Sequence, residues 1–280
     1  MANENFGISD SIGTSTPSLA TKNYENVDCY SCRVSDSKSS VGLPYEAKKE
    51  KRKINTMSLC IALAFDEKMY IAADSKSSVC VGKSSFGNKT KYSIPASFSY
   101  KKIFQVVLHE QDSSPIIGFS VGDNTFDSKN LSEFVKSLNF SDCTCIDNVA
   151  EVIKTSLNLN VNLVDINSSF LLFRYEDKKF KKAIIEKNDK AYDCNTGDFL
   201  PPQGEAIKST AGADWAKELS EYMLIIIPER EEEGTVYGIN QVFENAKIVG
   251  PYFDDSVGGL IHIGKLTPDG FTWLQNGYEL

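Results

Sequence analysis

The sequence lacks several features that mark common protein classes. It has no run of about 18 apolar residues, so a membrane-spanning helix is not expected. Its N-terminus, Met-Ala-Asn-Glu-Asn-Phe, carries neither the basic nor the apolar stretch of a secretory signal. It is also poor in positive charge, with 30 Lys and Arg against 38 Asp and Glu. These absences predict a cytoplasmic protein whose partners are neither membranes nor nucleic acids.

Histidine and patterned cysteine are scarce as well. The two histidines, His109 and His262, stand in no motif with Cys or Asp, which disfavours a histidine-based catalytic site. Seven cysteines are an odd number for a long chain, which is typical of free thiols in a reducing compartment. Cys29 and Cys32 form one Cys-x-x-Cys pair, but no second pair lies at the spacing of a zinc site. We therefore expect neither a metal nor a cofactor.

Residues 1–57 differ from the rest of the chain. They are rich in Ser, Asn, Thr and Lys, show no sustained apolar period, and carry the basic run 48–53 near their end. Such a composition buries too little apolar surface to fold. We expect a disordered leader or propeptide-like extension here, followed by one domain over 58–280. The basic run is interpreted as a solvated linker, with a nuclear signal or an anionic-surface contact as alternatives.

From Ser58 onward, alternating and continuous apolar runs predict strands that come in pairs. The expected hairpins are 58–65 with 69–73, 103–109 with 115–121, 168–175 with 181–185, and 260–266 with 271–274. The stretch 75–100 is polar and too long for a tight turn, so it is interpreted as an insertion. Because hairpins dominate, the sheets should be mainly antiparallel.

Apolar residues at helical spacing predict four helices in two blocks. They are expected around 131–138 and 149–157, the latter capped by Asp147, and then around 215–223 and 239–246. Each helix has one apolar stripe and should cover one side of a sheet. The order of elements predicts an α+β fold of two stacked sheets with a helical layer on each outer side.

The segment from Ser58 to Ser75 carries a specific resemblance. It reads Ser-Leu-Cys-Ile-Ala-Leu-Ala-Phe-Asp-Glu-Lys-Met-Tyr-Ile-Ala-Ala-Asp-Ser, with Asp74 sixteen residues after Ser58. It resembles the first hairpin of proteasome-type N-terminal-nucleophile (Ntn) hydrolases, including bacterial and archaeal proteasome subunits. In that family an N-terminal nucleophile precedes an Ala-Ala-Asp-Ser/Thr motif at this spacing. The resemblance implies the Ntn hydrolase fold, a four-layer αββα sandwich of two mainly antiparallel sheets.

Three further segments extend the resemblance over about 58–275. The run 101–104, Lys-Lys-Ile-Phe, is similar to the family's Lys-Lys-Ile segment, whose second Lys belongs to the active site. The run 118–123, Gly-Phe-Ser-Val-Gly-Asp, is similar to the glycine segment that supplies the oxyanion hole. The run 254–259, Asp-Asp-Ser-Val-Gly-Gly, resembles the entry into a late strand. A homo-oligomeric ring or stack is implied by the same resemblance.

The resemblance implies a nucleophile and a base in one residue. A serine hydroxyl needs a base to take its proton, and a free α-amine titrates near about 8. Ser58 would therefore be the nucleophile and its own α-amine the base. Lys102 would lower the pKa of that amine by like-charge repulsion, and Asp74 would hold the lysine charged and in place.

Four more residues receive supporting roles from the resemblance. The backbone N–H of Val121 or Gly122 would stabilise the oxyanion of an acyl-transfer intermediate. Asp254 or Ser256 would support the amine by hydrogen bonding. Peptides or other amides would be the substrates.

Plainer interpretations stay open for the same residues. Ser58 is also compatible with the start of an edge strand, Asp74 with a turn cap, and Lys102 with a solvated surface position. Gly258 and Gly259 are compatible with a purely architectural role.

The chain departs from the family pattern in two places. Met57 rather than Gly precedes Ser58, and an internal serine has no free amine. Initiation at Met57 followed by removal of that Met would expose Ser58. Val121 stands where the family has a small glycine. Rival nucleophiles are Thr56, which is two residues too far from Asp74, and Cys60, which requires a register slip of two.

Three functions follow from these patterns. The first is a serine- or threonine-type peptidase or amidase that uses Ser58. The second is a catalytically inactive structural or assembly subunit with the same fold. The third is a small-molecule amidohydrolase that acts on acyl amides rather than on peptides.

Overall fold

The structure is a computed structural model that describes residues 58–85, 88–108, 114–122, 125–126, 128–160, 163, 167–201, 207–224, 231–253 and 256–278. The chain divides into two units, 1–50 and 51–280, and all of the described residues belong to the second unit. The predicted leader 1–57, with Cys29, Cys32 and Thr56, therefore lies outside the described residues.

The first large sheet has five strands in the order β12-β1-β2-β13-β14, and each neighbouring pair is antiparallel. Its strands are β1 (Leu59–Phe65), β2 (Lys68–Asp74), β12 (Ile207–Gly212), β13 (Ile261–Thr267) and β14 (Gly270–Gln275). Strand β1 is an interior strand, because Cys60 lies opposite Ala73 of β2 on one side and Ala211 of β12 on the other. Ser58, which precedes β1, is therefore not at the edge of the sheet.

The second large sheet also has five strands, in the order β11-β10-β9-β6-β5, and is likewise antiparallel throughout. Its strands are β5 (Ile103–Val106), β6 (Ile116–Gly122), β9 (Ser168–Glu176), β10 (Lys179–Asn188) and β11 (Ala191–Asp198). Two separate hairpins complete the β-structure, β3 (Ser77–Ser85) with β4 (Asn88–Ser97) and β7 (Thr125–Phe126) with β8 (Lys129–Asn130).

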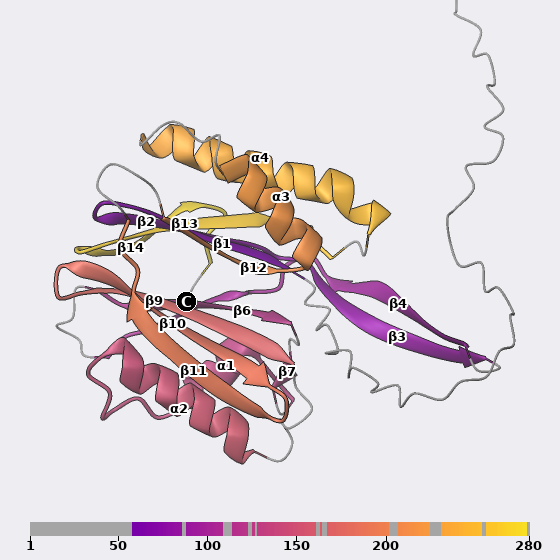
Figure 1. The fold of residues 1–280 in the computed structure, drawn as a ribbon, viewed down its shortest axis with the longest axis horizontal. Coiled ribbons are helices and arrows are strands. Elements are labelled where there is room, and N and C mark those ends of the chain that lie inside the picture. The colour runs from indigo at the N-terminus through magenta and orange to yellow at the C-terminus, as the bar shows by residue number, and fades with distance from the viewer. Residues whose placement is uncertain are drawn as a thin grey trace, which may run out of the picture. The chain divides into compact units, whose positions relative to one another are not determined.

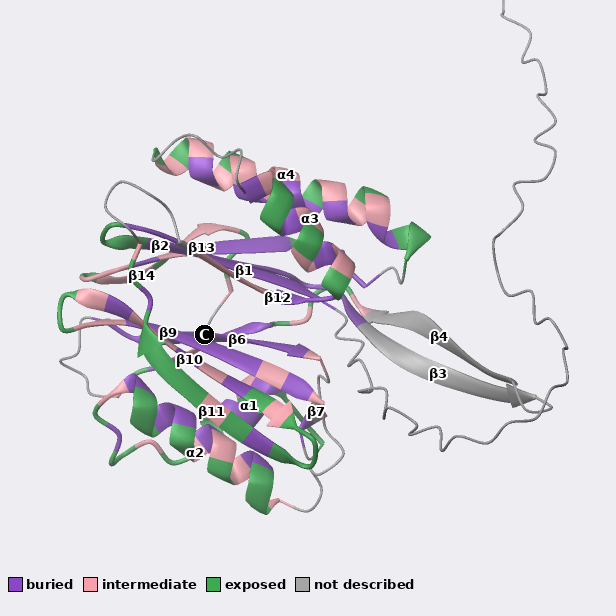
Figure 2. Cartoon of the chain, viewed as in Figure 1, coloured by how far each residue is buried: buried purple, intermediate pink, exposed green. Residues whose placement is uncertain are grey.

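The helices lie on opposite sides of the pair of sheets (Figure 1). Helices α3 (Asp214–Leu224) and α4 (Glu232–Val249) lie over the first sheet, and α1 (Leu131–Lys136) and α2 (Ile146–Leu159) lie against the second. A short 3-10 turn, η2 (Gly250–Tyr252), follows α4. Helices α2, α3 and α4 each have a buried and an exposed side (Figure 2), as one apolar stripe requires.

Three clusters of buried residues hold these elements together. One joins the first sheet to α3 and α4, a second joins the other sheet to α1 and α2, and the third contains residues of both sheets. Along β1 the side chains alternate between clusters, with Leu59 and Ile61 on the helix side and Cys60 and Ala62 on the side of the second sheet. The shared cluster combines these small residues of β1 with bulky residues of the second sheet, such as Phe119 of β6.

The predicted α+β class with two antiparallel sheets is confirmed, and all four predicted hairpins are present. Three details are corrected. The stretch 75–100 contains the hairpin β3–β4, in which Val79 lies opposite Ile94. Strands β11 and β12 were not predicted individually. Helix α2 begins after Cys145, so Asp147 lies inside its first turn, where a negative charge suits the positive end of the helix dipole.

No helix in the described ranges is long and apolar enough to cross a membrane.

Candidate functional site

The Asp74 carboxylate, at the end of β2, accepts hydrogen bonds from four donors. Its Oδ1 accepts from Lys102 Nζ at 2.7 Å and from the backbone N–H of Leu59 at 3.0 Å. Its Oδ2 accepts from the backbone N–H of Gly258 at 3.1 Å and of Lys76 at 3.2 Å. The side chains of Asp74 and Lys102 are both fully buried. A buried carboxylate is stable only with such partners, and here one cation and three N–H groups supply them.

The Asp74–Lys102 ion pair connects the two large sheets. Asp74 ends β2 of the first sheet, and Lys102 directly precedes β5 of the second. The carbonyl of Lys102 accepts from the N–H of Ser120 at 3.2 Å, which ties the lysine backbone to β6. Lys101, its neighbour, is exposed, whereas Lys102 is buried. The interpretation of Lys102 as a solvated surface residue is therefore wrong.

Ser58 is fully buried and directly precedes Leu59, the first residue of β1, whose N–H binds Asp74. Its carbonyl accepts from the N–H of Ala213 at 3.0 Å, which continues the β1–β12 ladder by one residue. Gly212 lies against the same carbonyl with φ +138°, and a Cβ at that position would overlap the Ser58 oxygen. The close approach needs glycine, so the backbone at Ser58 is held from two sides.

Leu59 N and Lys102 Nζ bind the same carboxylate oxygen. The two nitrogen atoms therefore lie at most 5.7 Å apart, the sum of their distances of 3.0 and 2.7 Å to Asp74 Oδ1. Leu59 N is the atom bonded to the carbonyl carbon of Ser58. The Lys102 ammonium group is thus fixed within 5.7 Å of the peptide nitrogen that follows Ser58, the candidate nucleophile.

Cys60, the rival nucleophile within the described residues, is buried in the cluster shared by both sheets. Burial raises the pKa of its thiol, and the opposing effect of the Lys102 ammonium is smaller. A thiol with a raised pKa carries little thiolate at neutral pH and is a poor nucleophile. Cys60 also keeps its place opposite Ala73, so the register does not slip.

The other predicted site residues are Val121, Gly122, Ser256 and Asp254. Val121 and Gly122 end β6, and the Val121 side chain belongs to the same shared cluster as Cys60. Gly122 lies opposite Ser168 with φ +109°, and a Cβ there would overlap the carbonyl oxygen of Asn167. Ser256 is buried two residues before Gly258, which binds Asp74. Asp254 lies outside the described residues.

Sequence reasoning missed several parts of this centre. Gly258 binds the Asp74 carboxylate through its backbone N–H, a contact that the sequence did not predict. Lys76 is buried, and its N–H lies close to both Asp74 Oδ2 and the carbonyl of Gly258. Ser75 Oγ links the carbonyl of Phe98 to the N–H of Leu260. The advance signal was position, because Ser75 is the last residue of the Ala-Ala-Asp-Ser motif and Lys76 directly follows it.

Among the described residues, no group of three or more His, Cys, Asp and Glu is placed to hold a metal ion.

Comparisons with known proteins add little to this geometry. No family model matches the chain, and no curated protein matches it in sequence. Among solved structures it is similar to eukaryotic HslV from Trypanosoma brucei, with 11% identity and a TM-score of 0.45. The match covers 75% of this chain and 99% of that chain. A likeness this distant carries no argument about activity.

Proposed function

We propose that this protein is an N-terminal-nucleophile hydrolase that cleaves peptide or amide bonds with Ser58. The observation that carries the proposal is the buried Asp74–Lys102 ion pair, whose carboxylate also binds the N–H of Leu59. Burying two charges is costly unless their partners are well placed. Here the pair fixes an ammonium group beside the one residue in which a hydroxyl and a free α-amine would coexist after processing.

In the proposed reaction, the α-amine of Ser58 takes the proton of Ser58 Oγ as that oxygen attacks the substrate carbonyl carbon. The amine then returns the proton to the leaving nitrogen, the C–N bond breaks, and an ester to Ser58 remains. Water attacks this ester with the same amine as base, which restores the hydroxyl and releases the acid. The Lys102 ammonium lowers the pKa of the amine and so keeps it unprotonated near neutral pH.

The remaining residues support this proposal by position. Val121 and Gly122 belong to β6, which contacts β1, so their N–H groups are candidates for the oxyanion donor. Ser256 is a candidate hydrogen-bond partner of the amine, since it is buried two residues before Gly258, which binds Asp74. Asp254 stays a prediction, because it lies outside the described residues.

The fold and setting are part of the same proposal. We propose that the two sheets with their outer helices form the αββα sandwich of Ntn hydrolases. A homo-oligomer and a cytoplasmic location stay predictions. The four cysteines that are free in the described part of the chain, Cys60, Cys143, Cys145 and Cys194, suit a reducing compartment.

The inactive-subunit alternative is favoured by one observation, the residue before the nucleophile. Met57 precedes Ser58, and a chain that retains it has a peptide nitrogen in place of the amine. The intact mass of the protein made from its own gene with native upstream DNA separates the two. A chain that begins at Ser58 supports the hydrolase, whereas retention of residues 1–57 supports the inactive subunit.

Activity is then measured on fluorogenic peptides and on short acyl amides. Ser58→Ala should reduce hydrolysis by at least about a thousandfold. Ser220→Ala is the matched control, because Ser220 is an equally buried serine in α3. Full activity of the Ser58→Ala protein would refute the assignment, and cleavage of acyl amides alone would indicate the small-molecule amidohydrolase.

A further inference from the structure

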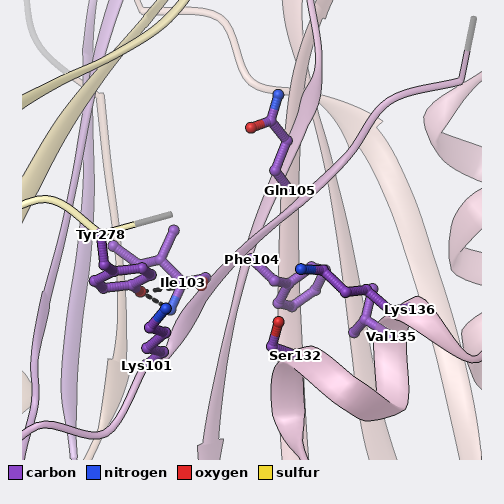
Figure 3. A pocket seen from close by; sticks show the side chains of 8 residues that line it. All are labelled: Lys101, Ile103, Phe104, Gln105, Ser132, Val135, Lys136 and Tyr278. Atoms are coloured by element: carbon purple, nitrogen blue, oxygen red, sulfur yellow. Dashed lines mark hydrogen bonds between the residues drawn. The ribbon is translucent and has the colours of Figure 1, made fainter. Parts of the chain in front are cut away.

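The segment that follows β14 returns to the strand that begins beside Lys102. The hydroxyl of Tyr278 accepts a hydrogen bond from the N–H of Ile103 at 2.8 Å and donates one to the carbonyl of Ile103 at 2.9 Å. Figure 3 shows the ring of Tyr278 beside Ile103, with Lys101 next to it, at one side of a small cavity. A single hydroxyl therefore clamps both polar backbone groups of the residue after Lys102.

The position of β5 in the sheet explains why Ile103 needs these partners. In the described part of the chain β5 is an edge strand, and β6 is its one neighbour in the sheet. Lys102 uses its carbonyl to bind Ser120 on β6. In an antiparallel ladder the direction of the backbone groups alternates, so the N–H and carbonyl of Ile103 point away from β6. Tyr278 takes the place of a missing strand at this one residue.

Tyr278 itself is held by the first sheet. Trp273 of β14 donates its indole N–H to the carbonyl of Tyr278 at 2.9 Å, and the two rings lie 4.9 Å apart. The ring of His262 on β13 makes an edge contact with Tyr278 at 4.7 Å. Tyr278 thus connects the first sheet to β5 of the second, one residue away from the Asp74–Lys102 connection.

We propose that Tyr278 is a positioning residue that holds Lys102 against Asp74, so that the segment 276–278 supports the candidate active site. The structural part of this inference stands on the contacts above, and its catalytic meaning rests on the proposed function. Two adjacent connections, the Asp74–Lys102 ion pair and the Tyr278–Ile103 hydrogen bonds, hold the start of β5 to the first sheet. Without the Tyr278 hydroxyl, the start of β5 keeps its hydrogen bond to Ser120 of β6 but loses one of its two connections to the first sheet, so the Asp74–Lys102 ion pair is left as the other.

A looser Lys102 has a predictable effect on the proposed base. A larger mean distance between the ammonium and the Ser58 amine weakens their repulsion, so the pKa of the amine rises. At a given pH a larger fraction of the amine is then protonated, and the protonated amine cannot act as the base. The acidic limb of the pH profile of kcat/KM should shift to higher pH by about half a unit, which lowers kcat/KM about threefold at pH values on that limb.

The test uses Tyr278→Phe and a matched control made from the full gene. Asn158 clamps Tyr192 in the same way, with its Nδ2 donating to the carbonyl at 2.9 Å and its Oδ1 accepting from the N–H at 2.7 Å. Tyr192 lies on β11, the opposite edge of the same sheet. Asn158→Ala therefore removes the same two kinds of hydrogen bond, but at the edge of the sheet opposite to β5, which follows Lys102.

The first readout is the rate at which the Lys102 ammonium protons exchange with solvent, measured by ¹⁵N NMR on the full chain. This measurement does not require the protein to be active. Exchange should be at least about tenfold faster in Tyr278→Phe and unchanged in Asn158→Ala. Trp273→Phe, which removes the N–H that holds the Tyr278 carbonyl and leaves a smaller ring against Tyr278, should give a smaller change in the same direction. Unchanged exchange in both the Tyr278 and Trp273 variants would overturn the inference.

The second readout is the pH profile of hydrolysis. A shifted acidic limb in Tyr278→Phe, with the limb of Asn158→Ala unchanged, supports the catalytic meaning of the clamp. An active wild-type protein with the same limb in all variants overturns that meaning. If the wild-type protein shows no hydrolysis that depends on Ser58, the proposed function fails, and the ammonium exchange still decides the structural inference.

Discussion

Removal of either partner of the Asp74–Lys102 pair should destabilise the protein, but by very different amounts. In Lys102→Met the buried carboxylate keeps its three N–H donors, Leu59, Lys76 and Gly258. In Asp74→Ala the ammonium group loses the carboxylate, which is its acceptor in the described part of the chain. The N–H groups of Leu59 and Gly258 lose theirs as well.

The magnitudes follow from these partner lists. Breaking a buried ion pair costs about 3–5 kcal/mol, and the remaining donors place Lys102→Met near the lower end, about 3 kcal/mol. Asp74→Ala adds two unsatisfied buried N–H groups at about 1–3 kcal/mol each, for a total of about 5–11 kcal/mol. The N–H of Lys76 counts for less, because the carbonyl of Gly258 lies 2.9 Å from it. A domain has only about 5–15 kcal/mol to lose.

Urea unfolding of the full chain, followed by circular dichroism, measures the difference. Lys102→Met should keep a cooperative transition at lower urea, whereas Asp74→Ala should have lost most or all of its transition. The double variant should be more stable than Asp74→Ala, because it no longer contains the unpaired ammonium. Equal losses in the two single variants, or a double variant less stable than Asp74→Ala, would refute the reasoning.

Three further variants test other parts of the structure. Gly212→Ala should cost at least about 2 kcal/mol in urea unfolding, because its Cβ would overlap the Ser58 carbonyl; Gly197→Ala, whose Cβ would meet open space, should stay within about 0.5 kcal/mol. Tyr70→Phe should raise the free energy of unfolding by about 1 kcal/mol, since the Tyr70 hydroxyl is buried without a hydrogen-bond partner in the described residues. His262→Gln should flatten the pH dependence of the melting temperature below pH 6.5.

The sign of the histidine effect follows from its surroundings. Burial lowers the pKa of His262 below its ordinary 6.5, although the Asn276 carbonyl and the Asp74 charge oppose this and Lys101 and Lys102 add to it. The unfolded chain then binds the proton more readily than the folded one. Stability is therefore full above pH 6.5 and falls as the pH drops through the folded-state pKa. A wild-type melting temperature that is flat from pH 7 to about 5 would contradict this prediction for His262. A Gly212→Ala variant more stable than the wild type would contradict the prediction for Gly212. A Tyr70→Phe variant less stable than the wild type would contradict the prediction for Tyr70.

Local patterns in the sequence predicted the hairpins, because each hairpin depends on residues close to one another, whereas the candidate centre came from the resemblance to a known family. The pairing of β1 with β2 follows from two apolar runs around a short turn, and the spacing of Ser58 and Asp74 follows from that hairpin. The hairpin β3–β4 was overlooked because its polar residues hid the alternation of Val79, Val81, Tyr92 and Ile94.

The contacts that complete the centre could not be predicted in the same way. Gly258 reaches Asp74 across 184 residues, and Tyr278 reaches Ile103 across 175. Neither partner stands in a motif with the other, and only the packing of the two sheets brings them together. The orientation of Val121 into the shared core is likewise a product of sheet packing rather than of local sequence.

The reach of the Asp74 carboxylate also constrains how the protein is made. Its donors are Leu59, Lys76, Lys102 and Gly258, so the last of them leaves the ribosome long after the other three. Contacts of such long sequence separation form late and slowly. A nascent chain therefore carries the charged pair before the backbone that encloses it exists. The candidate hydrolytic centre is completed only after residue 258 has been synthesised, which delays any activity until both sheets have formed.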